Sequence, residues 1–273
     1  MGFNANRELK RFLEEDIGKG DITSKLVKQQ QIIAKIISRE ETIVAGVNFA
    51  KQIFTLKGCH VKIVRKNGEK SKVNQTILEI RGNSSSILSC ERTALNLLSR
   101  MCGIANKTNH FVKILRKTRS RSKLFATRKT APGLRQFDKI AVEIGGGHKH
   151  RMSLDEMIMI KDNHISLESL ESLIKKARKT RKKIEVEVEN QNDAILAAKM
   201  GVGIIMLDNF TPAQITSVMK KLKNLKLLKN VKLEASGRIN EKNISKYGKT
   251  DVDMISVGEI TNSVNGIDLS LEI

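Results

Sequence analysis

The sequence predicts an α/β fold, in which a region of mixed helices and strands precedes a series of alternating strands and helices. Apolar residues recur with helical spacing in several segments, and short runs rich in Val and Ile lie between them. From about residue 123 the two patterns alternate, as is typical of parallel strands joined by helical crossovers. The chain has 273 residues, 40% of them hydrophobic, which is enough for one large or two medium domains.

The N-terminal region is predicted to contain both kinds of element. In chain order we expect a helix at 7–15, strands within 31–47, a helix at 48–57, and strands at 61–64 and 75–81. A longer helix is predicted at 84–105, because its apolar residues keep helical spacing and Gly103 lies where such a helix would end. A second helix is expected at 106–116.

The alternating series that follows is predicted to end each strand in polar residues or glycine. Strands are expected at 123–127, 156–160, 183–189, 202–207, 231–235 and 254–257, and helices at 166–179, 191–200, 212–222 and near 241–247. In a βα-barrel the carboxyl ends of the strands form the active-site face. The residues expected to converge on such a mouth are Lys161, Glu187 or Glu189, Asp208, Ser236 and Gly258.

Three glutamates alternate along the strand expected at 183–189. Glu185, Glu187 and Glu189 therefore point to the same face of that strand. On an inward face they would need cations or a metal ion, whereas on a solvent-exposed edge strand they would need neither. Because Asp208 ends the next strand, a hard divalent cation shared with a substrate phosphate is one expectation.

The segment 127–164 gathers basic residues beside glycines. Its cations are Arg128, Lys129, Arg135, Lys139, Lys149, Arg151 and Lys161, and it also holds three histidines and a glycine triplet at 145–147. Arginine forks suit planar carboxylates, lysines suit phosphates, and glycines let backbone N–H groups approach an anion. The segment therefore predicts a pocket for a small molecule that carries several negative charges.

The net charge of +21 makes nucleic-acid binding the first rival interpretation. Against it, aromatic residues make up only 3% of the chain, so few side chains can stack on bases, and we expect no nucleic-acid partner. The three cysteines lack metal-ligand spacing, no apolar run is long enough to span a membrane, and the N-terminus has no apolar signal core. A cytoplasmic location without membrane association is therefore expected.

Several motifs together resemble those of the quinolinate phosphoribosyltransferases, the carboxylating nicotinate-nucleotide pyrophosphorylases of NAD synthesis. They are GDITS at 20–24, ERTALNLL at 91–98, MCGIANKT at 101–108, TRKTAPGLR at 127–135, GGGHKHR at 145–151, IKDNHI at 160–165, EVEVEN at 185–190, LDNF at 207–210, EASG at 234–237 and ISVGEIT at 255–261. The match runs over nearly the whole chain. TRKTAPGLR followed by GGGxxHR and KDNH is specific as a set.

The resemblance implies an N-terminal α/β sandwich domain followed by an open, incomplete α/β barrel. The sandwich would cover residues 1–105 and be joined by the C-terminal tail 264–273, and the barrel would cover 106–263. The implied reaction transfers a phosphoribosyl group from phosphoribosyl diphosphate to quinolinate with decarboxylation, and Mg²⁺ is the implied cofactor. A homodimer, or a hexamer built from dimers, is also implied, with Arg92 contributed across the interface to the partner's site.

The resemblance assigns one group of residues to quinolinate. Arg128, Lys129, His150 and Arg151, beside Thr127, would hold its two carboxylates. Two further interpretations stay open: a relative on the same scaffold that uses nicotinate, and a molybdenum-transport-associated paralogue whose substrate is unknown. Quinolinate needs cations for two carboxylates, and the residues assigned to it suffice for both.

A second group is assigned to the phosphoribosyl donor. Lys161, Glu187 and Asp208 would face the ribose and diphosphate, and the two carboxylates would hold Mg²⁺ directly or through water. Ser236, Gly237 and Gly258 would cradle the phosphate end. Arg238, where the family often has a glycine, is expected to add a phosphate-binding cation or to cap a turn. The residues expected to be catalytic are Lys129, Lys161, Glu187 and Asp208.

Overall fold

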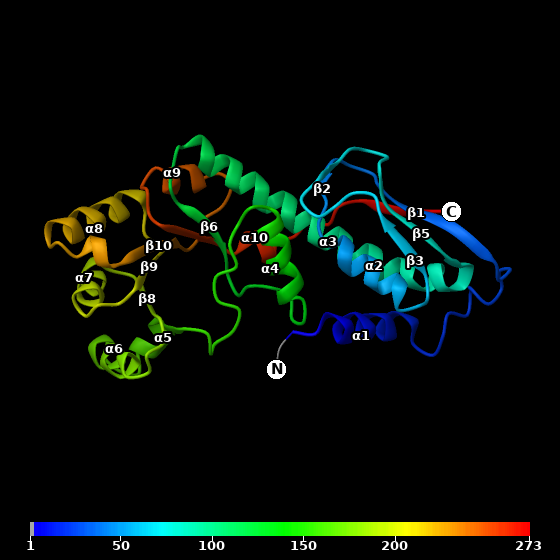
Figure 1. Ribbon diagram of the computed structural model, residues 1–273. Helices are drawn as coiled ribbons and strands as arrows, with labels where there is room; N and C mark the ends of the chain where they lie inside the picture. Colours follow the sequence, from blue (N-terminus) through cyan, green and yellow to red (C-terminus); the bar gives the residue numbers. More distant parts are fainter. Residues whose placement is uncertain (1–2) are drawn as a thin grey trace. The chain divides into compact units, whose positions relative to one another are not determined.

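The structure, a computed structural model, describes residues 3–273 and confirms the predicted α/β class (Figure 1). The chain packs into two compact units. The first contains the described residues up to Asn109 together with 136–146 and 263–273, and the second contains His110–Arg135 and Gly147–Asn262. Across residues 3–273, no helix combines the length and the apolar character needed to cross a membrane.

The first unit is built on a four-stranded antiparallel sheet. Its strand order is β12-β1-β5-β3, with bounds Leu269–Glu272, Gln31–Ser38, Thr76–Asn83 and His60–Ile63. A two-stranded pair, β2 (Thr42–Ile43) with β4 (Lys70–Ser71), accompanies it. The pairing of Lys35 with Glu272 joins the last strand of the chain to the first.

Three helices of the first unit share an aromatic core. They are α1 (Ala5–Ile17), α2 (Val47–Thr55) and α4 (Arg135–Ile144). The fully buried ring of Phe137 on α4 lies 5.7 Å from Phe12 on α1 and 4.9 Å from Phe49 on α2, with Phe3 at 5.4 Å. Such aromatic pairs add roughly 0.5–1.5 kcal/mol each beyond their burial, so α4 is fixed to this unit although no helix was predicted there.

A single helix, α3 (Ser84–Lys117), replaces the two helices expected at 84–105 and 106–116. The prediction that Gly103 marks a helix end was wrong. A Cβ added at Gly103 would lie 2.1 Å from the carbonyl oxygen of Asn265, so the glycine permits close approach of the C-terminal segment. A sequence pattern cannot distinguish a glycine needed for packing from one that ends a helix.

The second unit is built on a six-stranded parallel sheet. Its order is β6-β11-β10-β9-β8-β7, with bounds Lys123–Ala126, Met254–Val257, Lys232–Ser236, Ile204–Asp208, Ile184–Val188 and Ile158–Ile160. The first and last strands of this order are edges, so the barrel is open, as the fold expectation had it. Helices α6 (Leu170–Arg178) and α7 (Gln191–Lys199) pack against strands β7 to β9, and α8 (Pro212–Asn224) packs against α7 (Figure 1).

Strand alternation divides the side chains of this sheet between two environments. One set, which includes Val186, Leu207 and Ala235, is fully buried and apolar. The other set points into the barrel, where Ile204 and Met254 pack with Met157 at the deep end. The polar residues of this second set lie toward the carboxyl ends of the strands. Two short helices follow strands directly at these ends, α5 (Asp162–Ile165) after β7 and α10 (Glu259–Asn262) after β11. Two other short elements, η1 (Leu228–Asn230) and α9 (Ile244–Gly248), precede β10 and β11.

We predict that Gly103→Ala destabilises the protein. Alanine is the better helix former by about 1 kcal/mol, so an unhindered helical site would be stabilised. Here the added methyl group meets backbone at Asn265, and overpacking of this kind costs about 1–3 kcal/mol. Denaturant unfolding measures the change, with Asn96→Ala at an exposed position of the same helix as the control. A Gly103→Ala protein more stable than wild type would show that the close contact does not exist.

Candidate active site

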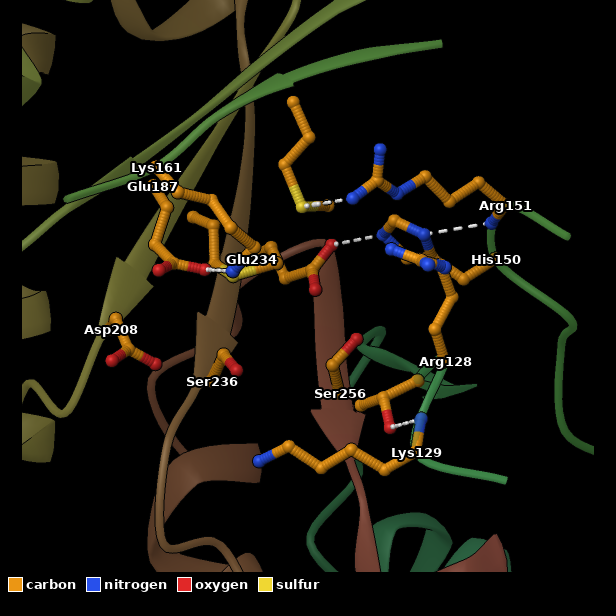
Figure 2. A pocket seen from close by; sticks show the side chains of 13 residues that line it. Arg128, Lys129, His150, Arg151, Lys161, Glu187, Asp208, Glu234, Ser236 and Ser256 are labelled. Carbon is orange, nitrogen blue, oxygen red and sulfur yellow. Dashed lines mark hydrogen bonds and ion pairs between the residues drawn. The ribbon is translucent and has the colours of Figure 1, made fainter. Parts of the chain in front are cut away.

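A cavity of about 410 Å³ opens at the carboxyl ends of the parallel strands (Figure 2). Its lining residues come from five strands, from the loop after β6, from the segment between α4 and β7, and from the position just after β7. They are Thr127, Arg128, Lys129, His150, Arg151, Met159, Lys161, Glu187, Met206, Asp208, Glu234, Ser236 and Ser256. The cavity therefore combines cations, carboxylates and hydroxyls within a volume that suits a small polar molecule.

The loop that follows β6 places Arg128 and Lys129 in the cavity. The Lys129 backbone N–H donates to Thr127 Oγ1 at 3.1 Å, and Thr261 Oγ1 donates to the Lys129 carbonyl oxygen at 2.8 Å. A Cβ at Gly258 would lie only 3.1 Å from Lys129 Cδ, so a larger residue there would press on this lysine. Gly258 thus contributes space beside Lys129 and is not itself a lining residue.

A second segment runs beside β6 and carries Arg151. The His148 N–H donates to the Leu124 carbonyl oxygen, and the His148 carbonyl oxygen accepts from Ala126 N–H, both at 2.9 Å, so the segment follows the free edge of β6. Arg151 is 7% exposed, and its guanidinium contacts the Met157 carbonyl oxygen at 3.4 Å and Met159 Sδ at 3.2 Å. Burial, and then the charge of Arg128, lower the pKa of Arg151. An anion bound between the two arginines would relieve that repulsion.

The opposite side of the cavity carries carboxylates. Glu187 on β8 forms an ion pair with Lys161, which directly follows β7. Asp208 ends β9, and its Oδ2 accepts a hydrogen bond from Asn209 Nδ2 at 2.6 Å. Glu187 and Asp208 therefore lie on neighbouring strands with both side chains in the same cavity.

Beneath these groups, two fully buried glutamates contact one imidazole. His150 Nε2 lies 3.1 Å from Glu234 Oε2 and 3.4 Å from Glu185 Oε2. Burial alone would lower the pKa of His150, but hydrogen bonds and charges from the two glutamates outweigh it and raise the pKa to about 9. Burial also raises the pKa of Glu185. The Arg151 N–H donates to His150 Nδ1, so Nδ1 carries no proton and the ring proton lies on Nε2. A further proton bound by the coupled cluster is therefore held by Glu185, whose burial favours its protonated form.

Most of the residues expected at the site from the sequence line this cavity. They are Thr127, Arg128, Lys129, His150, Arg151, Lys161, Glu187, Asp208 and Ser236. Of the two glutamates left open, the cavity contains Glu187, whereas Glu189 lies past the end of β8 and is exposed. Arg135, Lys139 and Lys149, from the same basic segment, do not line it.

Three other expected residues lie outside the lining. Gly237 has φ +89, and a Cβ there would lie 2.6 Å from the Asn209 backbone N, so it allows the loops after β9 and β10 to touch. Arg238 is exposed, has φ +52, and uses its carbonyl oxygen to accept from Asn243 Nδ2 at 3.0 Å. Arg92 is exposed on α3 in the first unit.

The sequence interpretation missed several lining residues, of which Glu234 matters most. Glu234 lies two residues before Ser236 on β10, so strand alternation places both side chains on one face. Alternation along β8 likewise places Glu185 on the same face as Glu187. Alternation along the strands was therefore the sequence signal that both glutamates point into the barrel. It could not show that a histidine from a distant loop lies between them.

Comparisons with known proteins show which family the chain resembles. The chain matches the sequence models of the quinolinate phosphoribosyl transferase C-terminal domain over residues 104–272 and N-terminal domain over residues 21–102. It is 43% identical to a probable carboxylating nicotinate-nucleotide pyrophosphorylase of Archaeoglobus fulgidus, over 93% of this chain and 98% of that protein.

Solved structures are similar over their full length. The nicotinate-nucleotide pyrophosphorylase of Francisella tularensis superposes with a TM-score of 0.91 at 37% identity, covering 98% of this chain and 95% of that one. The enzyme of the same name from Ehrlichia chaffeensis gives a TM-score of 0.92 at 32% identity, covering 100% and 99%.

Proposed function

This chain belongs to the quinolinate phosphoribosyltransferase family, and from that premise we propose how its barrel mouth carries out the family's reaction. The enzyme transfers the phosphoribosyl group of phosphoribosyl diphosphate to the ring nitrogen of quinolinate. The 2-carboxylate leaves as CO2, and nicotinate mononucleotide and diphosphate are the other products. The observation that best fits this reaction is one cavity with paired arginines on one side and paired carboxylates on the other.

Quinolinate occupies the side of the cavity formed by Arg128 and Arg151. Two adjacent ring carboxylates require two sets of donors, and the two guanidinium groups offer planar forks for them. Thr127 and Lys129 lie on the same loop as Arg128. Because Arg151 is nearly buried beside Arg128, binding a dianion there replaces repulsion between two cations with attraction.

The phosphoribosyl donor occupies the side formed by Lys161, Glu187 and Asp208. Attack by the ring nitrogen as diphosphate leaves gives the ribose oxocarbenium character, and nearby carboxylates stabilise that developing positive charge. Lys129 and Lys161 offset charge on the departing diphosphate. Ser236, with the loops that contain Gly237, Arg238 and Gly258, holds the phosphate end.

Glu187 and Asp208 are suited to hold Mg²⁺, directly or through water. Within residues 3–273, the only group of three or more candidate metal ligands is the buried set around His150, so these two carboxylates form a separate pair. Mg²⁺ typically uses one or two protein carboxylates and completes its shell with water and substrate phosphates. When bound, the ion would neutralise charge on the leaving diphosphate.

Decarboxylation demands little of the protein. Once the ring nitrogen carries the ribose it is positively charged, so it stabilises the electron pair that stays on ring carbon C2 when CO2 leaves, and a proton from water then forms the C2–H bond of the product. The side chains that held the 2-carboxylate then serve to keep the ring in place and to exclude other orientations.

The enzyme acts as a homodimer, or as a hexamer built from dimers, in which Arg92 enters the partner's site. Arg92 is an exposed cation on α3. The exposed GDITS region of the same unit supports association, because Ile22 and Leu26 are 77% and 85% exposed. The unpaired state of all three cysteines is consistent with a cytoplasmic location.

We predict that Arg151→Ala reduces kcat/KM for quinolinate by at least about 100-fold, because losing one partner of a buried charge pair costs on the order of 2–5 kcal/mol. Steady-state kinetics measure the loss, and thermal unfolding checks the fold. Lys149→Ala is the matched control: it removes the same charge two residues away, outside the cavity. Equal, small effects of both variants would contradict the assignment of Arg151.

Mixing two inactive variants tests the shared site. Arg92→Ala and Arg151→Ala each damage every site of their own dimer. In mixed dimers one site receives both substitutions and the other receives none, so roughly a quarter of wild-type activity should return after subunit exchange. Activity measured before and after exchange gives the result. No recovery, with exchange confirmed by mass spectrometry, would place Arg92 in its own subunit's site or outside any site.

A further inference from the structure

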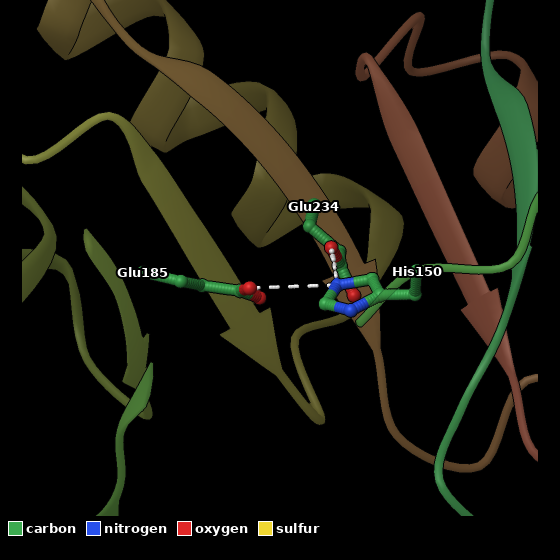
Figure 3. A group of neighbouring side chains, drawn as sticks. All are labelled: His150, Glu185 and Glu234. Carbon is green, nitrogen blue, oxygen red and sulfur yellow. Dashed lines mark hydrogen bonds and ion pairs between the residues drawn. The ribbon is translucent and has the colours of Figure 1, made fainter. Parts of the chain in front are cut away.

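Two glutamates of the barrel have no part in the reaction described above. Glu185 and Glu234 are fully buried, on strands β8 and β10, which are separated by β9. Their carboxylates approach the same atom, His150 Nε2, from two sides (Figure 3). Burying two carboxylates costs several kcal/mol unless each is paired, so an arrangement that converges on one ring points to a role for that ring.

Both ring nitrogens of His150 are occupied within the protein. Nε2 faces the two carboxylates (Figure 3), and Nδ1 accepts the backbone N–H of Arg151 at 2.8 Å (Figure 2). The ring therefore has no nitrogen left to bind a carboxylate of quinolinate, the role that family resemblance gave it.

The same geometry argues against a metal ion at this group, although its ligand atoms lie within 4.8 Å of one another. A histidine that binds a metal through Nε2 carries its proton on Nδ1 and donates it to a neighbouring acceptor. Here the neighbour of Nδ1 is itself a donor, the Arg151 N–H. Metal binding would bring two N–H groups face to face.

The backbone of His150 explains what the ring achieves. In an extended segment, consecutive side chains point to opposite sides, yet His150 and Arg151 both line the cavity. His150 has φ +54, a left-handed conformation that costs a non-glycine residue on the order of 1–2 kcal/mol. The ring's contacts with Glu185, Glu234 and the Arg151 N–H hold this conformation, and with it the direction in which Arg151 leaves the chain.

We propose that Glu185, His150 and Glu234 form a positioning cluster that aims Arg151 at quinolinate, and that His150 is not a substrate ligand. The proposal rests on the proposed function in one respect, the assignment of Arg151 to quinolinate. It gives a role to two buried glutamates and changes the role of His150.

A double-mutant cycle between the cluster and Arg151 tests the proposal. Glu234→Met replaces one of the two carboxylates with an apolar side chain of similar size and leaves Glu185 beside His150, so the ring keeps one carboxylate partner. It should raise KM for quinolinate at least tenfold, with KM for phosphoribosyl diphosphate changed less than about threefold. Because the cluster acts through Arg151, Glu234→Met combined with Arg151→Ala should be no worse than Arg151→Ala alone.

Conservative variants separate positioning from folding. Glu234→Gln keeps an oxygen that can accept from Nε2 and should retain quinolinate KM within about threefold of wild type. His150→Asn tolerates the left-handed backbone but lacks the ring, and it repeats the cycle with Arg151→Ala if Glu234→Met does not fold. Metal analysis of purified wild type and of Glu234→Gln completes the set.

The cycle could overturn the proposal in one way. If the increases in quinolinate KM from Glu234→Met and Arg151→Ala multiply in the double mutant, His150 and its glutamates contact the substrate independently of Arg151. A stoichiometric metal ion that Glu234→Gln loses would overturn it in favour of a metal site. If Arg151→Ala leaves quinolinate kinetics unchanged, the assignment of Arg151 in the proposed function fails, an outcome distinct from multiplicative losses in the cycle.

Discussion

Charge compensation inside the open barrel is the constraint on which the rest of the site depends. The strands supply the acids, which are Glu185, Glu187, Asp208 and Glu234, and the loops supply the cations, which are Arg128, Lys129, Arg151 and Lys161. A charge removed from water is costly unless an opposite charge or hydrogen bonds accompany it. Glu187 pairs with Lys161, and Glu185 and Glu234 contact the His150 ring, while the charge of Arg128 lowers the pKa of Arg151. The cavity therefore favours the binding of an anion.

Several loop residues at the carboxyl ends of the strands have a strained backbone, and this backbone conformation sets the directions of the side chains beside them. His150, Asn209 and Arg238 have φ of +54, +58 and +52, and each lies in a loop at the carboxyl ends of the strands. Residues held in such conformations cost on the order of 1–3 kcal/mol and persist only where their surroundings fix them. At Asn209 the fixing contacts are a backbone hydrogen bond to the Ser236 carbonyl oxygen and a side-chain hydrogen bond to Asp208. Two of the strained residues, His150 and Asn209, therefore lie directly beside the cavity residues Arg151 and Asp208.

Much of the barrel could be predicted from the sequence, because its strands and helices alternate with clear periods and polar residues or glycine stand at or just after the strand ends. Strand order and period two together also place Glu187 and Asp208 in one cavity. The parts that could not be predicted depend on contacts between distant segments. Gly103 reads as a helix end until Asn265 is known to touch it, and α4 is fixed by aromatic rings from two other helices. The convergence of Glu185 and Glu234 on His150 spans 84 residues between His150 and Glu234, and no local pattern encodes it.

The central claim is that the paired arginines recognise two carboxylates on one ring. The most direct test compares quinolinate with nicotinate, which lacks the 2-carboxylate, as substrates of the wild-type enzyme with phosphoribosyl diphosphate and Mg²⁺. Formation of nicotinate mononucleotide would be followed in both cases, and release of CO2 with quinolinate. The account predicts turnover with quinolinate, one CO2 per nucleotide, and a kcat/KM for nicotinate at least about 100-fold lower. Equal turnover of the two substrates, or turnover of nicotinate alone, would contradict it.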